Sequence, residues 1–158
     1  MWCDQVLRNC LDMTSRDDRA VDPVDLGWFE CAGVLKKQTR GGEPIRVILP
    51  RGETLRHGDV VFEEASRVIV INVLPCEVIV VSAAGKKDMA TLALELGNLH
   101  LPTQLGDGEL IFIEDGPALE VLDRLRLPWR KEVRRFEPTP VRSAPIAKLA
   151  GDFRIIKP

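Results

Sequence analysis

The chain has 158 residues and a mass of 17.6 kDa, which suits one ordinary domain or two very small ones. Hydrophobic residues make up 45% of the sequence and charged residues 29%, a balance typical of folded proteins and unlike that of disordered chains. The 22 Lys and Arg residues oppose 24 Asp and Glu residues, so the net charge is −2. No global positive field is available for a phosphate backbone, and we expect no nucleic-acid partner.

The longest apolar run is too short to span a membrane. It covers residues 68–81, is interrupted by Asn72, Cys76 and Glu77, and falls short of the roughly 20 residues that a spanning helix needs. The first five residues also lack the basic and apolar regions of a secretory signal. We therefore expect no membrane partner and a cytoplasmic location. The four cysteines form no CxxC motif and are expected to remain free thiols.

Short segments separated by turns predict that the first half of the chain is all-β. Residues 1–27 are polar and rich in aspartate, and are expected to form a weakly ordered arm or a short element. A strand is expected over 28–40, after which the Gly41-Gly42 turn leads into a second strand over 45–49, forming a hairpin. Segments rich in β-branched residues predict further strands over 60–62, 68–73 and 78–81.

The hydrophobic period changes after Ser82, where three- and four-residue steps predict a helix. Its apolar residues are Met89, Leu92, Ala93 and Leu96, and Gly97-Asn98 is expected to end it. A second helix is predicted where Asp115 can cap the first turn and Pro117 can occupy it. The remaining strands are expected over 99–101, 109–113 and 132–136.

These patterns predict an α+β protein with two domains and a tail. Residues 1–75 are expected to form the N-terminal β domain. The order β, α, β, β, α, β over residues 76–137 predicts a ferredoxin-like C-terminal domain. Four prolines in residues 138–158 indicate a flexible C-terminal tail.

The residue types leave little room for catalysis. The sequence has two histidines, no tyrosine, no Gly-rich phosphate loop, and neither a GxSxG nor an HExxH motif. We therefore expect that the protein is not an enzyme. One alternative stays open, a cysteine-dependent enzyme that pairs Cys76 with His100, which would require a stabilised thiolate.

His100 lies where the first predicted helix ends and the chain becomes extended. Its simplest interpretation is an exposed or half-buried histidine whose positive form interacts favourably with the helix dipole. A single imidazole is a poor metal site because a first-row divalent ion needs several donors. A two-fold dimer with this loop on its axis would supply the same imidazole twice. The other histidine, His57, lies in a turn and is assigned to the solvated surface.

Several segments of the chain carry a resemblance to a known family. The most specific is 97–100, which reads Gly-Asn-Leu-His and is followed by Pro102, Gln104 and the Gly-Asp-Gly-Glu-Leu turn at 106–110. Further upstream, 49–52 reads Leu-Pro-Arg-Gly, and Gly-Asp-Val follows at 58–60. In their order and spacing these segments resemble the UreE family of urease accessory proteins, whose members are nickel metallochaperones.

The resemblance implies a homodimer whose N-terminal domain is similar to a co-chaperone peptide-binding domain and whose ferredoxin-like C-terminal domain binds the metal. It implies that His100 of both subunits holds Ni²⁺ at the dimer interface, with Zn²⁺ or Cu²⁺ as competing ions. It further implies delivery of Ni²⁺ for assembly of the urease active site. The implied partners are the urease apoprotein and accessory proteins that include a GTPase.

The sequence departs from the family pattern in its shortage of histidines. Many members carry a histidine-rich tail, whereas residues 137–158 contain no histidine. Glu114 and Asp115 could donate oxygen ligands, but we favour a strand end and a helix cap for them. A basic run could face an acidic partner such as the accessory GTPase, although a solvated face is favoured. It comprises Arg124, Arg126, Arg130, Lys131, Arg134 and Arg135.

The chief alternative function is a non-catalytic adaptor. Its N-terminal sheet would bind a peptide, and its histidine would be merely structural. Such an adaptor would bind its partner with or without nickel, which distinguishes it from a metallochaperone.

Overall fold

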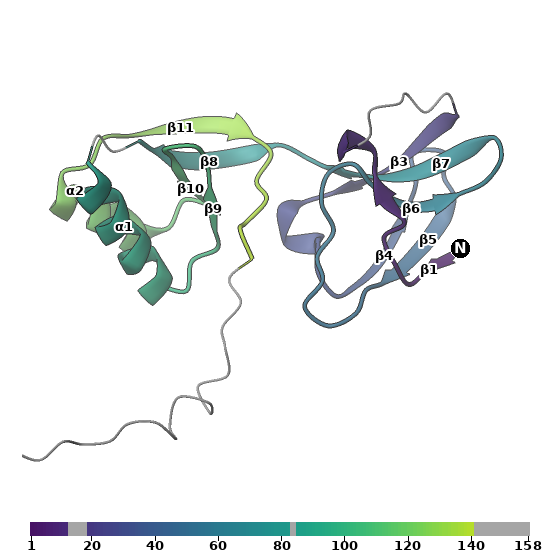
Figure 1. The fold of residues 1–158 in the computed structure, drawn as a ribbon, viewed down its shortest axis with the longest axis horizontal. Coiled ribbons are helices and arrows are strands. Elements are labelled where there is room, and N and C mark those ends of the chain that lie inside the picture. The colour runs from purple at the N-terminus through teal and green to yellow at the C-terminus, as the bar shows by residue number, and fades with distance from the viewer. Residues whose placement is uncertain (13–18, 83–84, 141–158) are drawn as a thin grey trace, which may run out of the picture.

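The computed structural model describes residues 1–12, 19–82 and 85–140 of the chain. These residues form two parts, which lie at opposite ends of the molecule in Figure 1. The N-terminal part (residues 1–73) consists of strands and two short 3₁₀-helices, and the C-terminal part (residues 76–136) combines a sheet with two α-helices. The expected α+β fold class is therefore confirmed. None of the helices in the described ranges is long and apolar enough to cross a membrane.

Two sheets pack face to face in the N-terminal part, one with strand order β1-β5-β4 and the other with strand order β2-β6-β7-β3. The strands are β1 (Trp2–Cys3), β2 (Arg8–Asn9), β3 (Ala20–Leu26), β4 (Val34–Gln38), β5 (Pro44–Ile48), β6 (Asp59–Glu63) and β7 (Arg67–Val73). Alternate side chains of both sheets point inward. The buried core between them includes Leu26, Leu35, Ile45, Val47, Ile69 and Ile71.

The predicted hairpin is confirmed, but the strand before it is shorter than expected. Strands β4 and β5 pair antiparallel around the Gly41-Gly42 turn, where Gly42 N–H donates to Thr39 O at 2.9 Å. Trp28–Glu30 forms a 3₁₀-helix instead of the start of a strand. The Glu30 carboxylate accepts a hydrogen bond of 2.9 Å from Gly27 N–H, which closes this turn locally.

The expectation of a weakly ordered arm or a short element over 1–27 is wrong for residues 20–26, which form a full strand of the sheet. Strand β3 pairs parallel with β7 along its whole length, and Val24 and Leu26 are fully buried. The Asp22-Pro23 pair resembles a strand breaker in the sequence. Because β3 is the edge strand of its sheet, the missing N–H of Pro23 leaves no gap in the hydrogen-bond ladder.

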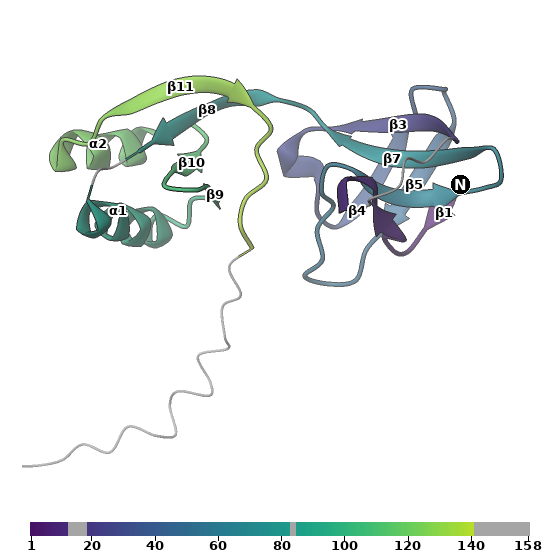
Figure 2. The ribbon, with the colours of Figure 1, turned by 45° about the horizontal axis from the view of Figure 1, so that its top comes forward.

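The C-terminal part has the predicted order of elements, β, α, β, β, α, β. They are β8 (Cys76–Val81), α1 (Lys86–Asn98), β9 (Thr103–Leu105), β10 (Leu110–Phe112), α2 (Gly116–Leu125) and β11 (Trp129–Arg134). The strand order is β11-β8-β10-β9, and all neighbours are antiparallel. Both helices cover one face of this sheet (Figure 2), where Leu92, Leu96 and Leu122 pack on Ile79 and Phe112.

Two predictions about the ends of these elements have different outcomes. The predicted cap of the second helix is confirmed, since Asp115 Oδ1 accepts a hydrogen bond of 3.1 Å from Ala118 N–H. The predicted strand over 99–101 is wrong. Leu99 and His100 belong to the closing turn of α1, and the short strand begins only at Thr103. Leu101 packs on the helix side of the core, which explains its apolar character without a strand.

Aromatic side chains join the two parts on the sheet face that the helices leave open. Phe136 is fully buried against Val78, Val80 and Ile111. The ring of Trp28, from the N-terminal part, meets the Phe136 ring edge-on with centroids 5.1 Å apart. Trp28 thus covers part of the C-terminal sheet and holds the two cores together.

Hydrogen bonds of the segment after β11 strengthen this junction. Glu137 Oε1 accepts a bond of 2.6 Å from His57 N–H, and Glu137 N–H donates to Gln104 Oε1 at 2.9 Å. Thr139 N–H donates to Thr103 O, and Thr139 Oγ1 accepts from Leu105 N–H, both at 2.9 Å. The start of the predicted tail therefore lies along β9. Residues 141–158 of the predicted tail lie outside the described residues.

We predict that Phe136→Ala destabilises the protein by about 3–5 kcal/mol, because it removes a fully buried ring at the junction. Phe29→Ala is the matched control, since Phe29 also contacts Trp28 but is 72% exposed. It should change the free energy of unfolding by no more than about 0.5 kcal/mol. Urea denaturation of both variants measures the difference, and equal losses would contradict the role of Phe136.

Candidate metal centre

His100 lies immediately after α1 in a left-handed backbone conformation. Its φ angle is 55°, a value that residues with a side chain rarely adopt. His100 N–H donates to Gly97 O at 3.0 Å, and Leu101 N–H donates to Leu96 O at 3.1 Å. These two bonds form the Schellman motif that commonly ends helices, with histidine where glycine is usual. The helix ends at Asn98, as the Gly97-Asn98 pair predicts, and the turn that closes it continues through His100.

The two residues that flank this turn anchor it in the core. Leu96 is buried, and Leu101 packs against the same cluster. His100 itself is exposed. The backbone on both sides of His100 is thus fixed by hydrogen bonds and packing while its imidazole remains accessible from outside the chain.

Exposed leucines lie on the elements around His100. Leu94 on the outer side of α1 is 70% exposed, and Leu105 in β9 is 59% exposed. Leu99, directly before His100, is also exposed. The sequence interpretation missed these side chains, although Leu94 lies out of phase with the buried stripe formed by Leu92 and Leu96. Exposed apolar side chains of this size are available for contact with another molecule.

One described chain does not assemble a metal site on its own. Within residues 1–12, 19–82 and 85–140, no three or more His, Cys, Asp or Glu side chains gather in a way that could hold an ion. Glu114 accepts a hydrogen bond from Lys131 Nζ at 2.6 Å, and Asp115 caps α2. The favoured roles of these two carboxylates, a strand end and a helix cap, agree with this geometry.

The structure does not bring Cys76 and His100 together as a catalytic pair. Cys76 begins β8, whereas His100 precedes β9, and β10 lies between these strands. Two strand spacings, about 10 Å, are too long for proton transfer. Burial also raises the pKa of the Cys76 thiol, the opposite of what an activated nucleophile needs.

The assignment of His57 to the solvated surface is wrong. His57 is half-buried at the junction of the two parts, and its Nδ1 atom is buried with no hydrogen-bond partner among the described residues. Burial lowers the pKa of His57, the nearby Arg135 lowers it further, and Glu137 partly opposes both effects. Because the backbone N–H of His57 donates to the Glu137 carboxylate, His57 contributes to the junction between the two parts.

The basic run forms ion pairs within the fold. Arg130 bonds to Glu109 at 2.6 Å, Lys131 to Glu114 at 2.6 Å, and Arg124 to Glu95 at 2.8 Å. These carboxylates already neutralise much of the run. The favoured interpretation as a solvated face therefore fits better than a docking site for an acidic partner.

Comparison with known proteins identifies the family. The profile of the UreE urease accessory protein N-terminal domain matches residues 3–74, and that of the C-terminal domain matches residues 76–150. The chain belongs to the UreE family of urease accessory proteins. The predicted resemblance is confirmed.

Individual relatives agree with this assignment. The urease accessory protein UreE of Bacillus cereus is 39% identical over 111 residues, which cover 70% of this chain and 73% of the relative. The protein of the same name from Actinobacillus pleuropneumoniae is 36% identical over 75% of this chain and 65% of its own length. That of Acetivibrio thermocellus is 29% identical over 87% of this chain and 91% of its own length.

We predict that His100→Gly makes this UreE-family protein more stable than His100→Ala by about 1 kcal/mol, because only glycine adopts the left-handed conformation without a steric cost. Arg126, which ends α2 with the same φ of 55°, provides the matched pair of variants. Urea denaturation should give the same order for Arg126→Gly and Arg126→Ala. An alanine variant that equals its glycine counterpart would contradict the assigned backbone strain.

We predict that acid weakens the fold through His57. Because its pKa is lowered in the fold, the unfolded chain binds a proton more readily, and stability falls as the pH drops below the ordinary value of 6.5. An NMR titration of the imidazole, assigned with His57→Gln, should give a midpoint below 6.5. A midpoint at or above 6.5 would show that burial does not act as described.

Proposed function

We propose that this protein is a nickel metallochaperone that delivers Ni²⁺ for assembly of the urease active site. Membership of the UreE urease accessory family supports this role. The cargo ion would lie at the interface of a homodimer, bound by His100 of both subunits. The single observation that carries this proposal is the exposed imidazole of His100 on a backbone fixed by the closing turn of α1.

Two features favour a shared site over a site within one chain. The described part of one chain offers no cluster of three metal-binding side chains, whereas two copies related by a two-fold axis would supply two imidazoles. The exposed Leu94, Leu99 and Leu105 give such a dimer apolar area to bury close to His100.

A site of two imidazoles completed by water suits delivery. Water ligands exchange readily, so the ligands of an acceptor protein can enter before the imidazoles leave. Zn²⁺ and Cu²⁺ bind the same donors, and Cu²⁺ binds more tightly, so selectivity for nickel would come from metal availability and from docking. Acid competes with the metal, because imidazole binds a metal ion only in its neutral form.

The partners of this role would be the urease apoprotein and accessory proteins that include a GTPase. We place the exchange in the cytoplasm, where a reducing environment keeps the four cysteines free.

We predict that the purified protein binds about one Ni²⁺ per dimer and that His100→Ala abolishes this binding without unfolding the chain. Isothermal titration with NiCl₂, combined with native mass spectrometry, measures the stoichiometry and the assembly state together. His57→Gln is the matched control, because it changes the other histidine of the sequence and should retain the site. Unchanged nickel affinity in His100→Ala, or a monomer with and without nickel, would contradict the proposal.

A further inference from the structure

The outer face of the sheet β1-β5-β4 lies on the side away from the N-terminal core. Ile45 and Val47 of β5 are buried, so Arg46 between them points outward. By the same alternation Lys36 of β4 and Trp2 of β1 are exposed. Trp2 is 72% exposed, an unusual position for the largest apolar side chain.

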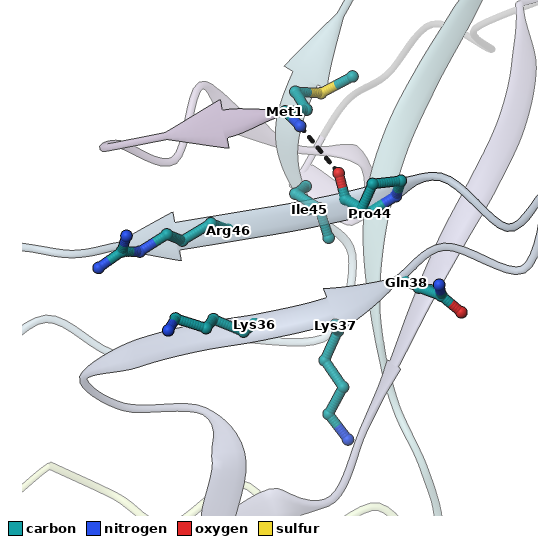
Figure 3. Close-up of a pocket in the computed structure, with 7 residues that line it drawn as sticks. All are labelled: Met1, Lys36, Lys37, Gln38, Pro44, Ile45 and Arg46. Atoms are coloured by element: carbon teal, nitrogen blue, oxygen red, sulfur yellow. Dashed lines mark hydrogen bonds between the residues drawn. The ribbon is translucent and has the colours of Figure 1, made fainter.

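Three of these outward side chains form one row across the sheet. Arg46 lies directly opposite Trp2 on one side and directly opposite Lys36 on the other. Figure 3 shows the Lys36 and Arg46 side chains extended side by side in the same direction, whereas Lys37 points elsewhere. The sheet therefore presents two parallel cations next to an indole ring.

This pair of cations is unfavourable for the isolated fold. Like charges directly opposite each other on antiparallel strands destabilise a sheet. No carboxylate of the described residues pairs with Lys36 or Arg46. The neighbouring Lys37, by contrast, forms an ion pair of 2.6 Å with Glu30. A repulsion that lowers stability and that no other contact in the fold offsets is typical of a functional surface.

Apolar side chains and two shallow hollows border the cations. The first hollow, of about 490 Å³, is lined by Met1, Trp2, Arg46 and Ile48. The second has a similar volume and is shown in Figure 3. Its lining comprises Met1, Lys36, Lys37, Gln38, Pro44, Ile45 and Arg46. The exposed Val34 lies opposite Ile48 and adds an apolar row beside the charged one.

We propose that the outer face, defined by Trp2, Val34, Lys36, Arg46 and Ile48, docks an acidic segment of a partner protein. Carboxylates of the segment would pair with Lys36 and Arg46, and an apolar side chain next to them would pack against Trp2 and Ile48. Charge complementarity favours an acidic segment as the occupant. Its carboxylates would supply the negative charges that the described residues do not place beside Lys36 and Arg46. The exposed Trp2 provides the kind of aromatic anchor that dominates binding energy at interfaces.

The same observations disfavour a nucleic acid. A phosphate backbone requires a run of cations along its length, whereas this face offers one row of two in a chain whose net charge is −2. The adjacent apolar row of Val34 and Ile48 suits side chains of a peptide. The proposal does not rest on the nickel site, which lies in the C-terminal part.

The test selects dodecapeptides from a phage-displayed random library on the full-length protein in the presence of EDTA. We expect enriched peptides that combine at least two Asp or Glu residues with an apolar residue. A fluorescein-labelled copy of the best peptide is then titrated by fluorescence anisotropy. No enrichment, or an enriched motif without acidic residues, overturns the proposal.

Lys36→Glu gives the sharpest variant because its two expected effects have opposite signs. The new carboxylate lies opposite Arg46, so the urea midpoint should rise while peptide affinity falls at least tenfold. Lys87→Glu, the same substitution at an exposed position in the first turn of α1, is the matched control and should leave binding unchanged. Equal peptide affinity in Lys36→Glu and the unaltered protein overturns the proposal.

Two further measurements identify the chemistry. A copy of the peptide with lysine at its acidic positions should bind Lys36→Glu better than it binds the unaltered protein. Trp2→Ala should weaken the binding of the original peptide at least fivefold.

His100→Ala should bind the peptide normally, so failure of this surface and failure of the metal site are distinguishable. Tighter binding of a 20-nucleotide oligo(dT) or of phosphatidylserine vesicles than of the peptide would assign the face to another class of ligand and overturn the proposal.

Discussion

The closing turn of α1 is the constraint on which the proposed nickel site depends. Hydrogen bonds from His100 and Leu101 back to the last helical turn hold the backbone, while Leu96 and Leu101 fix it to the core. Arg126 ends α2 in the same conformation, so the left-handed backbone alone does not mark a metal ligand. What distinguishes His100 is an accessible imidazole on a rigid support, with exposed leucines on the two elements that it joins.

The two proposed binding surfaces lie in different parts of the molecule, which are packed against each other. The closing turn of α1 belongs to the C-terminal part, and the outer face belongs to the N-terminal sheets. Trp28 and Phe136 pack between them, and Glu137 bonds to both His57 and Gln104. A partner bound at one surface would therefore be held at a defined orientation to the other.

Local signals predicted much of this fold, and long-range contacts account for the errors. The buried stripe of α1 and the Asp115 cap involve neighbouring residues, so their sequence pattern is sufficient. Strand β3 depends on β7, more than forty residues away, and the edge position that accommodates Pro23 is visible only in the sheet. The position of His57 likewise depends on a hydrogen bond to Glu137, which is 80 residues away in the sequence. For the candidate site, the sequence predicted the residue His100 and its place at a helix end. It did not predict the left-handed backbone, since a glycine three residues earlier is the more usual stop.

The C-terminal sheet protects both of its open sides. Along β9, Thr139 forms hydrogen bonds with the main-chain oxygen of Thr103 and with the main-chain N–H of Leu105. Along β11, the charged Arg130 and Lys131 discourage the addition of another strand. Backbone pairing between copies along either edge of this sheet is therefore disfavoured, so the C-terminal sheet does not continue from one molecule into the next. Contacts between copies through this part of the molecule would instead involve its side chains, as in the shared site proposed around His100.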